Sequence, residues 1–179
     1  MEYNCQELLL TSLNEFYIKN NNYKTIFKTI IYGNHKLSLR LIDWLVTHYS
    51  RNNNIYYWKL DNDKIYYNLP SNDNRRFKKI NIYLDYRAQL KSYTKLNFDT
   101  FRRHHRITFY INDKDKIETT VGQLNFFRWA FSNNIIEYAI NNYDEIYNNM
   151  IKSNNYKKKI KKNTHFQEII KADCILRFD

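Results

Sequence analysis

Glycine and proline are scarce in this chain, which has two glycines, Gly33 and Gly122, and one proline, Pro70. The sequence therefore has no glycine-rich loop of the kind that cradles phosphates, and neither the GxSxG nor the HExxH motif occurs in it. Loops have to be read from hydrophobic periodicity and from clusters of Asn and Asp. These absences weigh against an enzyme, and we expect a non-catalytic protein without a cofactor.

Cysteines and long apolar runs are also lacking. The two cysteines, Cys5 and Cys174, stand near opposite ends, and neither they nor the five histidines form a metal-binding spacing. We therefore expect a reduced intracellular protein with no disulfide and no metal site. No apolar run approaches the roughly 18 residues of a membrane span. The N-terminus, MEYNCQELLL, lacks a basic signal-peptide head, so no membrane partner is expected.

The apolar content is sufficient for a folded core. Of 179 residues, 43% are hydrophobic and 17% aromatic, which excludes wholesale disorder and suits one domain. We predict a single α+β domain over residues 1–151, followed by a basic C-terminal tail over residues 152–179.

Positive charge dominates the chain and is unevenly distributed. The net charge is +11, and residues 71–106 hold ten basic and three acidic residues, including six of the ten arginines. Residues 152–179 hold eight basic and three acidic residues. A bias towards A+T-rich codons would explain abundant Asn, Ile, Lys and Tyr, but it would not gather arginines. Clustered charge of one sign indicates a polyanionic partner.

The stretch FDTFRRHHRITFY, residues 98–110, places three arginines and two histidines between aromatic residues. Arginine suits phosphate because its planar fork donates two parallel hydrogen bonds and keeps its charge. The alternative is a solvated loop whose aromatics face the core. The predicted phosphate contacts are Arg75, Arg76, Lys78, Lys79, Arg102, Arg103 and Arg106, and the predicted sequence-independent arm is Lys157, Lys158, Lys159, Lys161 and Lys162. The arm has two alternatives, a nuclear-import signal and a solvated tail.

Hydrophobic periodicity predicts helices near both ends and strands in the middle. The expected N-terminal helices are Glu7–Ile18, Tyr23–Tyr32 and Leu37–Tyr49, with Gly33 ending the second and Ser38 capping the third. The expected strands are Ile55–Leu60, Lys64–Tyr67, Ile80–Asp85, Ile107–Ile111 and Ile117–Val121, with a short helix over Tyr86–Tyr93. Turns are expected at residues 61–63 and 112–116. The order favours an α+β fold with a small, mainly antiparallel sheet of hairpins.

A long helix is expected after Thr120, because Gln123 stands three residues on and completes a capping box. Its apolar stripe comprises Leu124, Phe127, Phe131 and Ile135, Trp129 lies off the stripe, and the helical pattern breaks at Asn133-Asn134 before resuming.

Two alternatives to nucleic-acid binding stay open. A protein–protein module would use exposed residues such as Arg128, Trp129, Tyr138 and Tyr143 as anchors. A phosphoesterase would use His104 or His105 as a general acid or base, and it would need that histidine in a pocket beside a second acid or base.

Two blocks of the sequence resemble a known family. FDTFRRHHRITFY resembles a block of the type FDPFCRRxRI, and TTVGQLNFFRWAFSNNIIEYA resembles a TT-[IV]-GQLNFF-[RK]-W block downstream of it. Residues 38–140 are thereby similar to an uncharacterised protein family of nucleocytoplasmic large DNA viruses of a mimivirus-like lineage. The chain departs from the first block at Thr100 and Arg102, where proline and cysteine are expected.

The resemblance implies a viral setting and transfers no catalytic residue. It implies the host cytoplasm, as a viral factory, or a virion as the location, with the nucleus as a further option. The leading hypothesis is a nucleic-acid-binding protein of late transcription, genome handling or packaging. Its partners would be DNA or RNA, bound with low sequence specificity because phosphate contacts read no bases, and other viral proteins.

Overall fold

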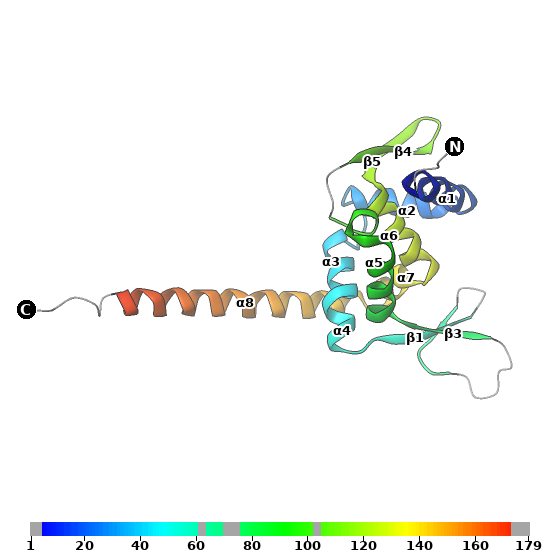
Figure 1. The fold of residues 1–179 in the computed structure, drawn as a ribbon. Coiled ribbons are helices and arrows are strands. Elements are labelled where there is room, and N and C mark those ends of the chain that lie inside the picture. The colour runs from blue at the N-terminus through cyan, green and yellow to red at the C-terminus, as the bar shows by residue number, and fades with distance from the viewer. Residues whose placement is uncertain (1–4, 61–63, 70–75, 102–104, 173–179) are drawn as a thin grey trace, which may run out of the picture.

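The computed structural model describes residues 5–60, 64–69, 76–101 and 105–172, with Cys5 and residues 158–172 as backbone only. The predicted α+β class is confirmed: helices form the body and two small antiparallel sheets lie beside it (Figure 1). The helices are α1 (Cys5–Lys19), α2 (Asn21–Ile31), α3 (Leu39–Trp44), the π-helical turn η1 (Leu45–Tyr49), α4 (Ser50–Asn52), α5 (Ile82–Asn97), α6 (Val121–Ser132), α7 (Ile135–Asn141) and α8 (Tyr143–Ala172). The strands are β1 (Tyr56–Leu60), β2 (Ile65–Tyr66), β3 (Phe77–Asn81), β4 (Arg106–Asn112) and β5 (Asp115–Thr120).

Helix α6 is the centre of the core. It begins as predicted, because the Thr120 hydroxyl accepts a hydrogen bond of 3.1 Å from the Gln123 amide. It ends at Ser132, and Asn134 then adopts a left-handed conformation that produces the predicted break. More of α6 is buried than the predicted apolar stripe indicates, because α1, α5 and α7 all pack against this helix. Trp129, expected off the stripe, is only 6% exposed.

The helices before the first sheet follow the sequence pattern closely. Helix α2 ends at Ile31, and Gly33 follows with a positive φ of 75°, as expected of a glycine stop. Ser38 caps α3, its hydroxyl accepting from the Leu41 amide. The predicted Leu37–Tyr49 helix continues to Asn52 and contains the π-helical turn η1.

Strands β2, β1 and β3 form a three-stranded antiparallel sheet in that order. The predicted Ile55–Leu60 and Lys64–Tyr67 hairpin is present as β1 and β2, and its predicted turn lies outside the described residues. The predicted strand over Ile80–Asp85 is wrong. The strand ends at Asn81, whose side chain accepts from the Leu84 amide and caps α5, and the expected short helix Tyr86–Tyr93 is part of that longer helix.

Strands β4 and β5 form a separate two-stranded hairpin. It matches the predicted hairpin, but its turn is tighter than expected, since Asn112 pairs with Asp115. The two sheets lie at opposite ends of the helical body (Figure 1). Phe109 is buried on the body side of β4, against the rings of Tyr17 and Phe27.

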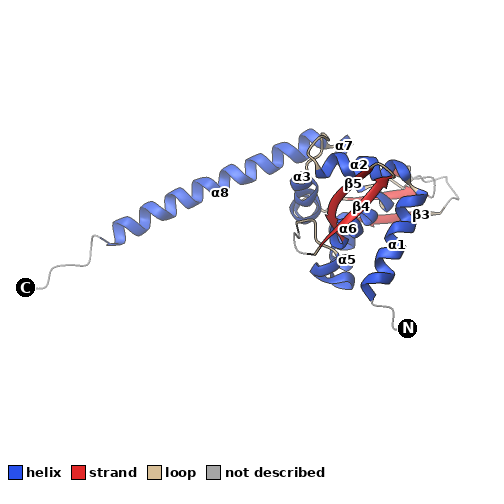
Figure 2. Cartoon of the chain, turned by 90° about the horizontal axis from the view of Figure 1, so that it is seen from above, coloured by secondary structure: helices blue, strands red, loops and turns tan. Residues whose placement is uncertain are grey.

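Helix α8 begins in the body and leaves it. Ile146 and Met150 are buried, and α3, η1 and α7 contact this first part of the helix. The rest extends away from the other elements (Figures 1 and 2). The backbone is helical across the predicted boundary at residues 151–152, so the basic segment to Ala172 continues the last helix.

Candidate nucleic-acid interface

The predicted basic residues lie in three separate parts of the fold. Arg76, Lys78 and Lys79 lie at or in β3, Arg106 begins β4, and Lys157 lies in α8. Lys78 and Lys79 of β3 and Arg106 of β4 belong to different sheets. Arg75, Arg102 and Arg103 lie outside the described residues, and for Lys158, Lys159, Lys161 and Lys162 the structure gives the helical backbone.

One face of the three-stranded sheet carries aromatic rings and lysine. Because side chains alternate along a strand, Tyr56 and Trp58 of β1 share a face with their cross-strand neighbours Tyr66 of β2 and Lys79 of β3. The Lys79 ammonium lies 4.2 Å from the centre of the Tyr56 ring and 5.7 Å from that of Trp58. We call Tyr56, Trp58, Tyr66 and Lys79 the outer sheet face.

The opposite face of the same sheet packs on the body. Tyr57 is fully buried, stacks on Tyr138 at 5.6 Å between ring centres and donates a hydrogen bond to the Asn133 carbonyl. Lys78 points the same way, and its ammonium donates to the Asn133 side-chain oxygen at 3.2 Å. The adjacent lysines therefore have different surroundings. Lys78 is hydrogen-bonded to the junction of α6 and α7, and Lys79 lies beside the rings of Tyr56 and Trp58.

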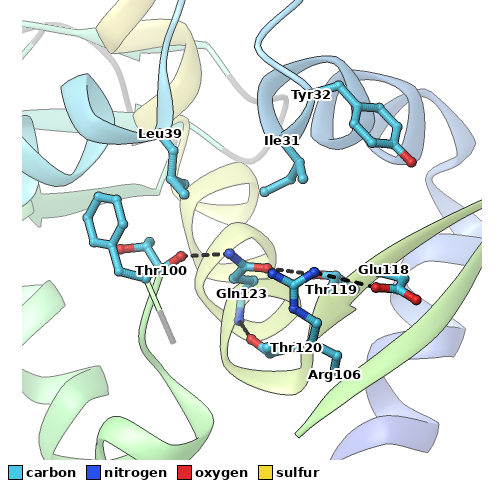
Figure 3. Close-up of a pocket in the computed structure, with 10 residues that line it drawn as sticks. Ile31, Tyr32, Leu39, Thr100, Arg106, Glu118, Thr119, Thr120 and Gln123 are labelled. Atoms are coloured by element: carbon cyan, nitrogen blue, oxygen red, sulfur yellow. Dashed lines mark hydrogen bonds and ion pairs between the residues drawn. The ribbon is translucent and has the colours of Figure 1, made fainter. Parts of the chain in front are cut away.

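Arg106 lines a cavity of about 560 Å³ between α2, α3, the β4–β5 hairpin and the start of α6 (Figure 3). Its guanidinium lies 3.4 Å from a Glu118 carboxylate oxygen on the paired strand, and both side chains are more than half exposed. Glu118 offsets much of the charge that Arg106 would offer a phosphate. The complete lining is Ile31, Tyr32, Leu39, Thr100, Phe101, Arg106, Glu118, Thr119, Thr120 and Gln123.

The wall of this cavity is built by hydrogen bonds between the two blocks that resemble the viral family. The Gln123 side chain donates to the Thr100 carbonyl at 2.7 Å and accepts from the Thr119 hydroxyl at 2.9 Å. Asn125 donates to the Asn97 carbonyl at 2.9 Å. Gly122 permits the approach, since a Cβ there would lie 3.1 Å from the Asp99 nitrogen. The GQLN sequence thus holds residues 97–100 against α6.

Phe98 completes that attachment from the other side. It is fully buried among the rings of Tyr86, Tyr93, Phe126 and Trp129. Of the aromatic residues in the arginine-rich stretch, Phe98 and Phe109 are buried, whereas Phe101 and Tyr110 are 47% and 61% exposed.

A half-buried carboxyl group lies close to the same attachment. Burial raises the pKa of Asp43, the nearby Asp99 carboxylate raises it further, and a hydrogen bond from Thr100 partly offsets both effects.

Helix α8 carries the densest positive charge in the described part of the chain. Between Ile146 and Gln167 it has six lysines and no Asp or Glu. Lys157 lies with its ammonium 5.8 Å from the Trp44 ring, and His48 stacks on that ring at 4.4 Å. Burial lowers the pKa of His48, and the positive charges of Lys157 and Arg51 lower it further.

The anchors expected for a protein–protein module are mostly internal. Trp129 and Tyr138 are 6% and 5% exposed, so neither is the exposed anchor that the protein–protein alternative requires. Arg128 donates to Asn125 and Tyr93 within the fold. Tyr143 is half-buried and stacks on Tyr147. Burial raises the pKa of Tyr138 to about 12. A partner-binding role would require other residues.

The described residues can be compared with what a phosphoesterase or a metal site would require. His105 is exposed just before β4, and His104 lies outside the described residues. Within residues 5–60, 64–69, 76–101 and 105–172, no three His, Cys, Asp or Glu side chains gather as a metal site would require. Among the helices of those ranges, none combines the length and apolar character needed to cross a bilayer.

The aromatic outer sheet face was not recognised as a site from the sequence. The sequence predicts Lys79 as a phosphate contact and places the three aromatic residues in strands, but it does not predict that all four side chains share one face. The available signal was the spacing: Tyr56 and Trp58 stand two apart, which places both rings on one side of a strand, and Lys79 became their neighbour through a pairing that sequence alone does not fix.

Comparison with known proteins identifies relatives but no activity. A family model described as "Family of unknown function (DUF7197)" matches residues 2–175. The chain is 31% identical over 166 residues to the uncharacterized protein L507 of Acanthamoeba polyphaga mimivirus, and the match covers 90% of this chain. The chain spans 60% of the length of that relative. No solved structure matches the chain.

Proposed function

The chain belongs to the DUF7197 family of unknown function, and we propose that it binds nucleic acid through the phosphate backbone, without catalysis and with low sequence specificity. In a virus with a large DNA genome, such a protein would serve late transcription, genome handling or packaging. The viral relative supports the setting, and the distribution of charge supports the chemistry.

The observation that carries the proposal is the segment of helix α8 from Ile146 to Gln167, which contains six lysines and no Asp or Glu. The backbone of this segment starts beside α3 and η1 and then extends away from the rest of the fold (Figure 2). A helix rises about 1.5 Å per residue, so the lysines from Lys152 to Lys162 extend over roughly 15 Å of it. That length suits an elongated polyanion better than a compact anionic ligand.

The internal energetics of this helix favour the same conclusion. Lys157 and Lys161 stand four apart, as do Lys158 and Lys162, and such like-charged pairs each cost a helix about 0.2–0.5 kcal/mol. Bound phosphates would remove that repulsion. The helix should therefore gain stability on binding, which distinguishes a binding arm from a solvated surface helix.

The test is a salt titration of binding to a labelled strand of about 30 bases and to the matching duplex. The wild type is compared with a variant in which Lys157, Lys158, Lys159, Lys161 and Lys162 are all changed to alanine. The control removes the same charge from five exposed lysines elsewhere: Lys19, Lys91, Lys95, Lys114 and Lys116. Circular dichroism confirms that each protein is folded.

We expect affinity to fall steeply with salt, because each neutralised phosphate contributes about 0.9 to the logarithmic slope on duplex DNA. With five lysines removed, the α8 variant should flatten that slope by up to about 4.5 on duplex DNA, whereas the control should change it much less. Absence of binding by the wild type at about 50 mM salt, or equal effects of the two variants, would contradict the proposal.

A further inference from the structure

Resting on that proposed function, we propose that the outer sheet face is a stacking platform for unpaired bases, which makes single-stranded nucleic acid the preferred ligand. Flat ring faces on an antiparallel sheet, with cations among them, are the chemistry by which proteins hold unpaired bases. The site differs from α8, which supplies charge alone.

The strand register places the four side chains as one surface. Trp58 of the central strand β1 pairs with Tyr66 on one side and with Lys79 on the other, so the three form a row across the sheet. Tyr56 stands two residues before Trp58, about 6.6–6.8 Å along the strand. Two separate rings therefore face the same side of β1, each large enough to cover one base.

The exposure of these rings is not explained by packing. Tyr56 is 42% exposed, and Trp58 and Tyr66 are half-buried, whereas Tyr57 between the first two is fully buried in the core. The inner face of the sheet thus packs against the helical body, and the outer sheet face leaves aromatic rings partly exposed to solvent. Single exposed apolar side chains are ordinary, but aromatic rings grouped on one face mark an interaction surface.

The charge around the outer sheet face indicates which kind of ligand it would bind. Lys79 lies over the Tyr56 and Trp58 rings, and the exposed Arg76 precedes β3. Residues 56–81 contain six basic and three acidic residues. A cationic partner would be repelled, and a neutral apolar partner would have to bury the Lys79 ammonium. A ligand with planar rings and negative charge, a single strand with its phosphates, fits both features.

Duplex nucleic acid does not fit this surface as well, because its bases already stack on one another and their faces are not available. The platform should therefore add affinity for a single strand and little for a duplex. Phosphate contacts alone would not produce that difference, since both ligands present phosphates.

The experiment compares an unpaired strand with an abasic strand of the same length, which carries the same phosphates without bases. Binding is measured by fluorescence anisotropy for the full chain, for Tyr56→Ala and for Trp58→Ala. Tyr110→Ala is the matched control, because Tyr110 is a 61% exposed tyrosine on a strand of the other sheet. Tyr56→Phe retains the ring and tests the hydroxyl.

We expect the wild type to bind the intact strand more tightly than the abasic one, and Tyr56→Ala to lose roughly 5-fold or more of the affinity for the intact strand only. Tyr110→Ala and Tyr56→Phe should leave the difference in place. The intact strand should also quench tryptophan emission, and Trp58→Phe should abolish the quenching, because Trp44 and Trp129 are 9% and 6% exposed.

Each outcome decides between the two proposals. Equal affinity for intact and abasic strands, or a preference that survives both Tyr56→Ala and Trp58→Ala, would overturn the stacking platform and leave phosphate binding in place. If neither strand binds the wild type, the proposed function itself fails. Trp58→Ala removes a half-buried ring, so its folding is checked by circular dichroism, and Tyr56→Ala decides the matter if that variant unfolds.

Discussion

Replacing Gly122 with alanine tests the claim that the GQLN block holds residues 97–100 against α6. A Cβ at this position would lie 3.1 Å from the Asp99 nitrogen, 3.2 Å from its oxygen and 3.3 Å from the Leu96 oxygen. All three are backbone atoms, so no side-chain rotation relieves the contact. Either the neighbouring segment moves by a few tenths of an ångström, or α6 does.

Movement of the segment is opposed from several directions. The Thr100 carbonyl accepts from Gln123, the Asn97 carbonyl accepts from Asn125, and Phe98 is fully buried. The Phe101 amide additionally donates to the Asp99 side chain at 2.8 Å. A shift away from α6 would lengthen at least one of these bonds or open a gap around Phe98.

The expected magnitude follows from two opposing effects. Overpacking a close contact costs about 1–3 kcal/mol, and alanine returns up to about 1 kcal/mol of helix propensity. Gly122 is the second residue of α6, where the propensity gain is smaller than in a helix interior. We expect a net loss of about 1–2 kcal/mol, which lowers the Tm of a chain of this size by about 2–8 °C.

The assay is thermal unfolding of the wild type, Gly122→Ala, Gln123→Ala and the double variant. If Gln123 holds the segment in place, removing its side chain lets the segment move, and the double variant should lose less stability than the sum of the single losses. A Tm of Gly122→Ala at or above that of the wild type would refute the reasoning, because the segment would then yield freely. Strict additivity would show that Gln123 does not hold it.

Two further variants test local interactions. Because the folded-state pKa of Asp43 is raised above its unfolded value, chiefly by burial, its ionisation opposes folding at neutral pH, and this cost disappears as pH falls through the folded pKa towards about 3.9. Asp43→Asn should therefore raise the Tm at pH 7.5, with a gain that shrinks towards pH 4; a pH-independent effect of either sign would contradict this. Asn81→Ala should lower the free energy of unfolding by about 1 kcal/mol in chemical denaturation, because it removes the cap of α5. Asn81→Ser should lower it much less, because serine also caps helices. Equal losses in both variants would show that the cap is not the cause.

Features set by a few adjacent residues could be predicted from the sequence. The Thr120 and Ser38 caps each depend on one side chain and a backbone amide three residues on, and the Gly33 stop depends on the positive φ that glycine adopts without strain. The β4–β5 hairpin also follows from local alternation and a short turn. The same reasoning failed at residues 80–85, where alternating apolar residues suggested a strand although Asn81 caps a helix. The alternation of apolar residues favours a strand and the Asn81 cap favours a helix, and the structure has the helix.

Features that depend on distant pairing could not be predicted. Nothing near Trp129 in the sequence indicates that Tyr86 and Phe98 cover it, because those rings come from α5 and the residue after it. The outer sheet face has the same origin, since β1 and β3 are separated by β2 and two loops. The run of lysines in α8, in contrast, is visible in the sequence, and together with Lys79 it belongs to the phosphate contacts that the sequence predicts.

The two parts of the candidate interface differ in how they respond to salt, and this separates their contributions in one experiment. Lysine–phosphate contacts set the slope of the logarithm of affinity against the logarithm of salt concentration, because each releases counterions. Stacking releases none, so it should shift the line without tilting it. The α8 variant should thus give a flatter line, and Tyr56→Ala a lower line parallel to that of the wild type. A change of slope in Tyr56→Ala would mean that the ring acts by positioning the Lys79 ammonium, 4.2 Å from its centre, against a phosphate.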